Sequence, residues 1–161
     1  MCDVLKEVLL MKNIKVAKET IEIIETGAYE VSDKKIVFNK EDHTSVVVYT
    51  PGDGETLLKK DISHLKRDKI CTIKIINSDS YEAARDLDNP YVMNFANAHN
   101  PGGGFKLGAN AQEEALCRCS TLYFAISESN TYNNFHKKHL SMLKGGKMDS
   151  TYNDEIGRAH V

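Results

Sequence analysis

The chain has 161 residues, of which 41% are hydrophobic and 27% are charged, and this composition predicts one folded domain or a part of one. Its 21 Lys and Arg residues against 23 Asp and Glu residues give a net charge of −2, without the basic excess of a general nucleic-acid-binding protein. No segment approaches the roughly 18 apolar residues of a membrane span, and the start of the chain lacks the pattern of a signal peptide. We therefore expect a cytoplasmic protein with no membrane partner.

The N-terminal part of the chain predicts a helix followed by two strands. Residues 4–26 carry apolar side chains at loosely helical spacing among Lys and Glu, and Gly27 follows as a C-terminal stop, which indicates one helix or two. Two β-like runs come next, at residues 36–39 and 45–49, and a Pro-Gly-Asp-Gly turn closes the second run. We expect both runs to be early strands of a sheet.

Strand and helix signals then alternate. Residues 70–77 are rich in β-branched side chains and predict a strand. A cluster of Asn, Ser and Asp follows and predicts the N-cap of a short helix over residues 80–87. Residues 91–95 are a compact apolar run that predicts a buried strand. This order indicates an α/β fold with helices on a sheet.

Helical spacing returns after a glycine-rich loop. An apolar stripe at positions i, i+4, i+8, i+11 and i+15 predicts a helix over residues 111–127 with one buried face. The members of this stripe are Ala111, Ala115, Cys119, Leu122 and Ile126. Residues 131–146 are polar and predict a helix or a loop without an apolar partner.

The cysteines and histidines predict no metal site. The cysteines are Cys2, Cys71, Cys117 and Cys119, and they form no C-x-x-C pair, so we expect free thiols in a reducing compartment. Cys117 and Cys119 would point to different faces of one helix, and at least one of them should be a core residue. The six histidines are scattered along the chain. His99 lies beside the glycine loop, where a structural or hydrogen-bonding role is favoured over catalysis.

Three successive glycines, residues 102–104, follow the predicted strand and precede Gln112, Glu113 and Glu114. Glycines allow the backbone to approach a bulky group closely and to direct N–H donors at it, and the N-terminus of the next helix adds partial positive charge. Both features favour a diphosphate. The loop is neither a Walker A motif nor the spaced glycine fingerprint of dinucleotide-binding folds.

The two adjacent glutamates allow two interpretations. Beside a bound phosphate they would supply an acid/base and an acceptor for ribose hydroxyl groups. Alternatively, Asn110 is the N-cap of the helix and Glu113 completes a capping box, because acidic side chains are favoured in a first helical turn whatever the function. The capping interpretation does not explain the three glycines, and the residues alone leave both interpretations open.

Three glycines, seven further residues and then Gln-Glu-Glu resemble the signature of the bacterial-type poly(ADP-ribose) glycohydrolases, which have a macrodomain-like fold. The segments 92–101 and 115–120 also look like this family. The resemblance implies a three-layer α/β/α fold with a mixed central sheet. It also implies that the fold is incomplete at the C-terminus, because complete members continue with further strands and helices.

By this resemblance, residues 1–154 are the N-terminal portion of one catalytic domain. Residues 1–27 would be a helical extension and residues 36–147 a portion of the macrodomain core. Residues 155–161 resemble the in-frame translation of a sequencing adapter, so we expect them to be an artefact and exclude them from fold reasoning.

The resemblance also implies roles for individual residues. Glu114 would be the catalytic acid/base that protonates the leaving ribose oxygen and then activates water, and Glu113 would hold ribose hydroxyl groups at that bond. Gln112 would orient the glutamates or the substrate, and Asn94 would be structural. The loop glycines would line the diphosphate and two asparagines would contact the distal ribose, so the implied substrate-binding residues are also Gly102, Gly103, Gly104, Phe105, Asn97 and Asn100.

The implied activity is hydrolysis of the ribose–ribose O-glycosidic bonds of poly(ADP-ribose), without a metal or another cofactor. Its partners would be poly(ADP-ribose) or ADP-ribosylated proteins, and ADP-ribose would be the product. Two alternatives stay open: a module that binds ADP-ribose without cleaving it, and an inactive fragment. The intact Glu113 and Glu114 argue against the binding module, because binding alone would not need both carboxylates.

Overall fold

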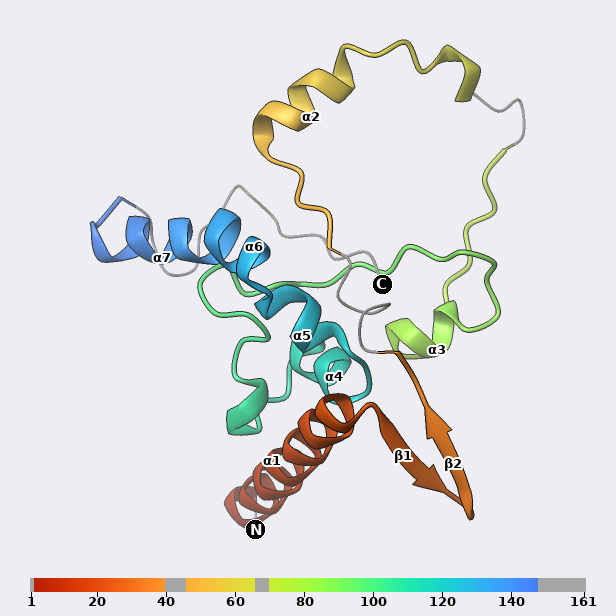
Figure 1. Cartoon of the computed structure of the whole chain (residues 1–161), viewed down its shortest axis with the longest axis vertical. Helices are drawn as coiled ribbons and strands as arrows, with labels where there is room; N and C mark the ends of the chain where they lie inside the picture. The colour runs from red at the N-terminus through yellow and green to blue at the C-terminus, as the bar shows by residue number, and fades with distance from the viewer. Residues whose placement is uncertain (1, 40–45, 66–69, 148–161) are drawn as a thin grey trace.

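The computed structural model describes residues 2–39, 46–65 and 70–147 of the chain, and it combines helices with a small sheet (Figure 1). The first half contains α1 (Cys2–Thr26), β1 (Ala28–Val31), β2 (Lys34–Val37), α2 (Pro51–Leu58), the 3-10 turn η2 (Ser63–Leu65) and α3 (Ser80–Ala84). The second half contains the 3-10 turn η3 (Phe105–Leu107), α4 (Gln112–Arg118), α5 (Leu122–Ser127), α6 (Ser129–Thr131), the π-helical turn η4 (Tyr132–His136) and α7 (Lys137–Lys144). The predicted artefact at 155–161 lies outside the described residues.

The N-terminal helix is confirmed as a single helix, α1, which ends where the sequence predicts. Gly27 has φ +70° and its N–H donates to the Ile23 carbonyl at 2.9 Å, as expected of a glycine that follows a helix C-terminus. The chain then forms the antiparallel hairpin of β1 and β2, in which Ala28 pairs with Val37. Ser32 and Asp33 both have positive φ in the turn, the geometry that suits a two-residue hairpin.

The predicted central sheet is not formed by the described residues, whose sheet consists of β1 and β2. Residues 70–77 and 91–95 follow an irregular path, and residues 46–49, the described part of the predicted strand 45–49, do so as well. Ile70, Ile73 and Ile75 are 87 to 98% exposed. A β-branched composition favours a strand only where neighbouring strands supply hydrogen bonds and a packed face. The segment containing α2 and η2 accordingly runs in a wide arc away from α1, α4 and α5 (Figure 1).

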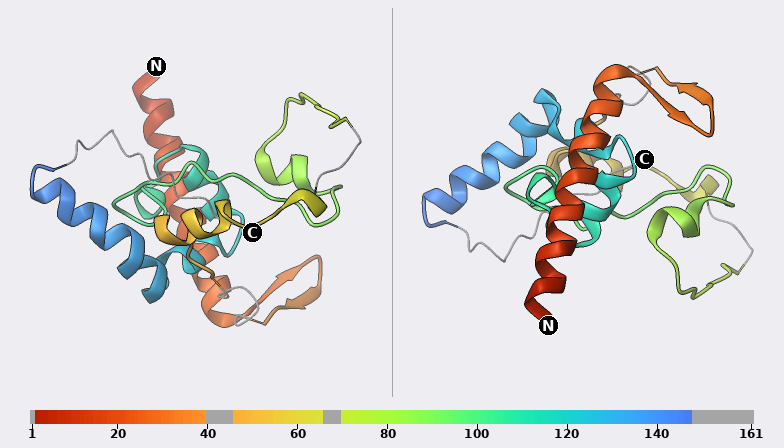
Figure 2. Two further views of the ribbon diagram at one scale, coloured as in Figure 1. Left: turned by 90° about the horizontal axis from the view of Figure 1, so that it is seen from above. Right: turned by 90° about the horizontal axis from the view of Figure 1, so that it is seen from below.

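The hydrophobic core lies where α1 packs against η3 and α4, and where α5 packs against α4 (Figure 2). Its buried members are Ala17, Phe105, Leu116, Cys117, Leu122 and Ile126. Cys117 is fully buried and Cys119 is exposed, which confirms that the two thiols occupy different environments. Burial raises the pKa of Cys117 to about 12, so this thiol behaves as an apolar core group.

The predicted helix over residues 111–127 is broken into α4 and α5, and its predicted buried face is wrong in the first half. The Ser120 hydroxyl donates to the Leu116 carbonyl at 2.8 Å and accepts from the Leu122 N–H at 3.1 Å, so a side chain replaces helical hydrogen bonds at the break. Leu122 and Ile126 are buried as expected. In α4, however, Glu113 and Glu114 are buried and Ala111, Ala115 and Cys119 are exposed.

The polar C-terminal segment is helical from α6 to α7. Glu128 caps it by accepting the Asn130 and Thr131 N–H groups. His136 and His139 are buried within it, and His136 lies close enough to His99 and His139 that their charges would lower its pKa, in addition to the larger effect of burial. The fold therefore gathers three of the histidines that the sequence leaves scattered.

None of the described helices combines the length and the apolar character needed to cross a bilayer. Within the described ranges, no group of three or more His, Cys, Asp and Glu side chains is arranged to hold a metal ion.

Candidate active site

Glu113 is held by three donors that the glycine loop and the preceding segment supply. Its Oε1 accepts from the Gly102 N–H at 3.3 Å and from Asn94 Nδ2 at 3.2 Å. Its Oε2 accepts from the Asn97 N–H at 2.8 Å. Glu113 and Asn94 are only 2% and 1% exposed, and a buried carboxylate requires such donors because it has lost its hydration. Both oxygens of Glu113 are therefore committed to the protein.

Glu114 lies beside Glu113 in a different arrangement. Its Oε1 accepts from the Gly104 N–H at 2.9 Å, and its side chain is buried at the edge of the loop. Among the described residues, no donor reaches its other oxygen, Oε2. Glu114 therefore keeps one oxygen that can exchange a proton with a bound molecule, whereas Glu113 does not.

The glycine loop surrounds these carboxylates, and its N–H groups serve the protein itself. The N–H groups of Gly102 and Gly104 donate to the two glutamates, and that of Gly103 donates to the Asn100 carbonyl at 3.0 Å. Gly103 has φ +53°, and a Cβ at this position would lie 2.5 Å from Glu114 Oε1. The absence of side chains in the loop thus allows its backbone to lie close to the two buried carboxylates.

Gln112 joins α4 to the segment before the loop. Its Oε1 accepts from the Phe95 N–H at 2.9 Å, and its Nε2 donates to the Met93 carbonyl at 2.7 Å and to Ser80 Oγ at 3.3 Å. A side-chain amide here hydrogen-bonds the backbone as a neighbouring strand would. Gln112 therefore orients the segment that carries Asn94, one of the donors to Glu113.

The capping interpretation of Glu113 is wrong in this structure. The N-cap of α4 is Ala111, which makes no side-chain cap. Asn110 Oδ1 instead accepts from Arg118 Nη2 at 2.8 Å, and Arg118 Nη1 donates to the Ala109 carbonyl at 2.7 Å. Arg118 thus fastens the loop to the C-terminal end of α4, a role that the sequence did not indicate.

The predicted substrate-binding side chains occupy different places. Asn97 Oδ1 accepts from the His99 and Asn100 N–H groups at 2.9 Å each, so Asn97 shapes the turn that precedes the glycines. Asn100 is exposed beside the loop. Phe105 is 1% exposed and its ring centroid lies 5.2 Å from that of Tyr123, which makes Phe105 a core residue that fixes the end of the loop.

His99 is buried at the same turn, as the structural role expected for it requires. Its Nε2 has no hydrogen-bond partner among the described residues. His136 Nδ1 lies 3.2 Å from the Ala98 carbonyl oxygen, so the helical segment after α5 also contacts this turn.

The free energy of unfolding of the chain should depend on pH through the titration of Glu113. Burial raises the pKa of Glu113, the three hydrogen bonds oppose this, and the neighbouring Glu114 raises it further. Above about pH 4.3, where an unfolded glutamate loses its proton, the folded state binds more protons than the unfolded state. The free energy of unfolding therefore falls as the pH rises through this window and stays at the lower value above it.

Glu113→Gln removes this titration, so we expect the stability of the parent relative to the variant to fall as the pH rises above about 4. Urea unfolding of both proteins across this range measures the difference. Groups common to both proteins cancel in it. A relative stability that rises with pH would show that the folded chain prefers the ionised carboxylate.

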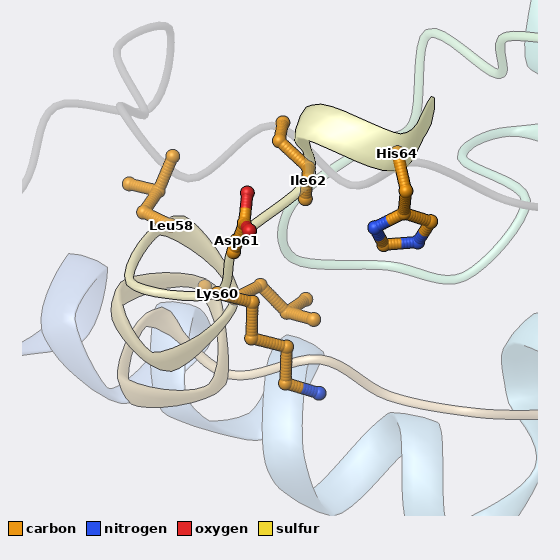
Figure 3. Close-up of a pocket in the computed structure, with 7 residues that line it drawn as sticks. Leu58, Lys60, Asp61, Ile62 and His64 are labelled. Carbon is orange, nitrogen blue, oxygen red and sulfur yellow. The ribbon is translucent and has the colours of Figure 1, made fainter. Parts of the chain in front are cut away.

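A hollow elsewhere in the structure does not reach the glutamates. It lies beside α2 and η2 (Figure 3). Its lining residues are Gly54, Leu57, Leu58, Lys60, Asp61, Ile62 and His64. Because it contains no residue of the loop or of α4, we do not assign the candidate chemistry to it.

Comparisons with known proteins show which family the chain resembles. The family model "Microbial-type PARG, catalytic domain" matches residues 17–150, where PARG stands for poly(ADP-ribose) glycohydrolase. A PARG structure from Thermomonospora curvata, bound to the inhibitor ADP-HPD, has a TM-score of 0.67 and 30% identity, over 82% of this chain and 48% of that chain. A second PARG structure from the same organism has a TM-score of 0.67 and 30% identity, over 83% and 50%. The chain spans about half the length of these relatives, and no match is found among curated proteins.

Proposed function

The chain belongs to the microbial-type PARG catalytic-domain family, and we propose that it takes part in hydrolysis of the ribose–ribose O-glycosidic bonds of poly(ADP-ribose). The observation that carries this proposal is the pair of buried carboxylates at the glycine loop. Adjacent carboxylates with different surroundings can take different roles in glycoside hydrolysis. A module that only binds ADP-ribose would gain nothing from burying both.

The hydrogen bonds divide the roles between the two glutamates. No described residue donates to Glu114 Oε2, so Glu114 is the acid/base that gives a proton to the leaving ribose oxygen and then takes one from water. Glu113 is anchored at both oxygens, and its remaining lone pairs orient ribose hydroxyl groups. The proposed reaction uses these carboxylates and a water molecule.

The substrate-binding part of the proposal extends to the surrounding loops. The relative bound to ADP-HPD supports a ligand of the ADP-ribose type for this chain. Because the N–H groups of Gly102 and Gly104 already donate to the glutamates, we propose that the loop meets the diphosphate mainly through its bare glycine surface. Asn97 and Asn100 lie on the turn beside it and would face the distal ribose.

The proposal also includes the wider setting of the site. Family membership supports a macrodomain-like three-layer arrangement around it. The unpaired thiols of Cys71 and Cys119 are exposed, which suits a reducing compartment, so we place the protein in the cytoplasm with poly(ADP-ribose) or ADP-ribosylated proteins as partners.

Incubation of the purified chain with poly(ADP-ribose) tests this function, and we expect time-dependent release of ADP-ribose, measured by liquid chromatography. A thermal melt with and without excess ADP-ribose accompanies it, because a ligand that binds the folded state raises its stability. Release of ADP-ribose supports the proposal. A melting temperature raised by ADP-ribose without any release would contradict it and favour the binding module.

A further inference from the structure

Asn13 is a buried polar side chain in the first half of α1, and it lies outside the residues 17–150 that the family model matches. Asn13 is 8% exposed, whereas its neighbour Lys12 is exposed. Its Nδ2 donates to the Gly108 carbonyl at 3.0 Å, a bond between positions 95 residues apart. A buried amide is costly unless it is hydrogen-bonded, so this contact gives Asn13 a specific reason to lie on the inner face of α1.

A second observation places the backbone of α1 directly against the same loop. Gly108 has φ +81°, and a Cβ at this position would lie 2.6 Å from the Leu10 carbonyl oxygen and 3.0 Å from Ile14 Cγ1. Real Cβ atoms do not tolerate the shorter approach, so a glycine is required here. The helix and the loop therefore meet at Gly108 through both a hydrogen bond and close backbone packing.

A series of hydrogen bonds links the turn at Gly108 to Glu114. The Gly108 N–H donates to the Phe105 carbonyl at 3.2 Å, and the Ala109 N–H donates to the Gly104 carbonyl at 3.2 Å. The Gly104 N–H in turn donates to Glu114 Oε1 at 2.9 Å. A Cβ on Gly104 would lie 2.6 Å from that of Ala109, so the turn from Gly104 to Ala109 is closed as tightly as its backbone allows.

We propose that Asn13 is a positioning residue that holds this turn against α1 and thereby fixes the N–H donor on which Glu114 rests. Asn13 acts on Glu114 indirectly, through Gly108 and Gly104. The kinetic part of this inference rests on the proposed function, since it treats Glu114 as the acid/base. The structural part, the restraint of the Gly104 N–H, does not depend on any activity.

The test compares the parent with Asn13→Asp, which has the same shape but no N–H donor, and with Asn13→Ala. Lys12→Ala, at the exposed neighbouring position on α1, is the matched control. Amide hydrogen exchange followed by NMR reports on the Gly104 and Ala109 N–H groups. Loss of one buried hydrogen bond should speed their exchange about fivefold to tenfold, while the amides of α5 and the control variant keep the exchange rates of the parent.

A kinetic measurement separates positioning from general destabilisation. For poly(ADP-ribose) hydrolysis we expect kcat of both Asn13 variants to fall about tenfold with KM within about twofold, because a misplaced acid/base slows the chemical step. Unchanged exchange at Gly104, or equal acceleration at all amides, would overturn the proposal. Should the parent release no ADP-ribose, the proposed function fails for this chain, and the exchange at Gly104 still decides whether Asn13 holds the turn.

Discussion

Replacing Glu114 with glutamine should lower kcat for poly(ADP-ribose) hydrolysis by about 10²- to 10⁴-fold, the usual range for loss of a general acid/base. Glutamine has nearly the shape of glutamate, and its carbonyl oxygen can still accept the Gly104 N–H bond that Oε1 accepts now. The variant therefore keeps the fold of the loop but cannot give or take a proton at the position of Oε2. Steady-state assays of ADP-ribose release measure the effect.

Glu55→Gln is the matched control for this substitution, because Glu55 is an exposed glutamate on α2, away from the loop. It should leave kcat, KM and the melting temperature unchanged. If Glu114→Gln keeps the activity of the parent, the acid/base role passes from Glu114 to another group. If the two variants lose activity equally, the assay is reporting a general effect of replacing a glutamate with glutamine.

The features that the sequence predicts well are those that a few neighbouring residues decide. The end of α1 at Gly27 depends on one residue that tolerates positive φ. The start of α3 depends on Asp79, whose carboxylate accepts the Glu82 N–H at 2.8 Å. Both signals act within one helical turn, so sequence spacing alone is enough to find them.

The features that the sequence predicts poorly depend on contacts between distant segments. Residues 70–77 have the composition of a strand but form no strand pairing in the described structure. Glu113 and Glu114 can lie on the inner face of α4 because the N–H groups of Gly102 and Gly104 donate to them. A prediction based on the apolar stripe alone places these carboxylates in water. The break at Ser120 likewise arises from a side chain that competes for helical hydrogen bonds.

The candidate site shows the same division. The motif of three glycines and two glutamates predicts that loop and carboxylates meet, and the structure confirms that they do. The motif does not predict which groups accept hydrogen bonds from the loop N–H donors, because sequence spacing does not tell where an N–H group points. Asn13 lies four residues before the buried Ala17 on α1, on an inner helix face where a polar side chain requires a partner, and only the structure shows this.

Gly103→Ala should lower kcat/KM for poly(ADP-ribose) hydrolysis by about 10²-fold or more, because the new methyl group would collide with the carboxylate that we propose as the acid/base. The added Cβ would lie 2.5 Å from Glu114 Oε1 and 3.2 Å from its Cδ, so the carboxylate must move, and a displacement of about 1 Å is enough for such a loss. The backbone at φ +53° adds strain of about 1 to 2 kcal/mol for a residue with a side chain. Steady-state kinetics and urea unfolding together measure both effects.

Gly54→Ala is the matched control, since a Cβ there would meet nothing within 4 Å and alanine favours the helix α2 that contains it. This control should keep the activity of the parent and be equally or slightly more stable. Backbone strain at this position lowers the stability of the protein but does not by itself remove activity. A Gly103→Ala protein that stays folded but is inactive would therefore show that the loss of activity comes from displacement of the Glu114 carboxylate. A folded Gly103→Ala protein with the activity of the parent would instead mean that Glu114 works from a position other than the one it occupies beside Gly103.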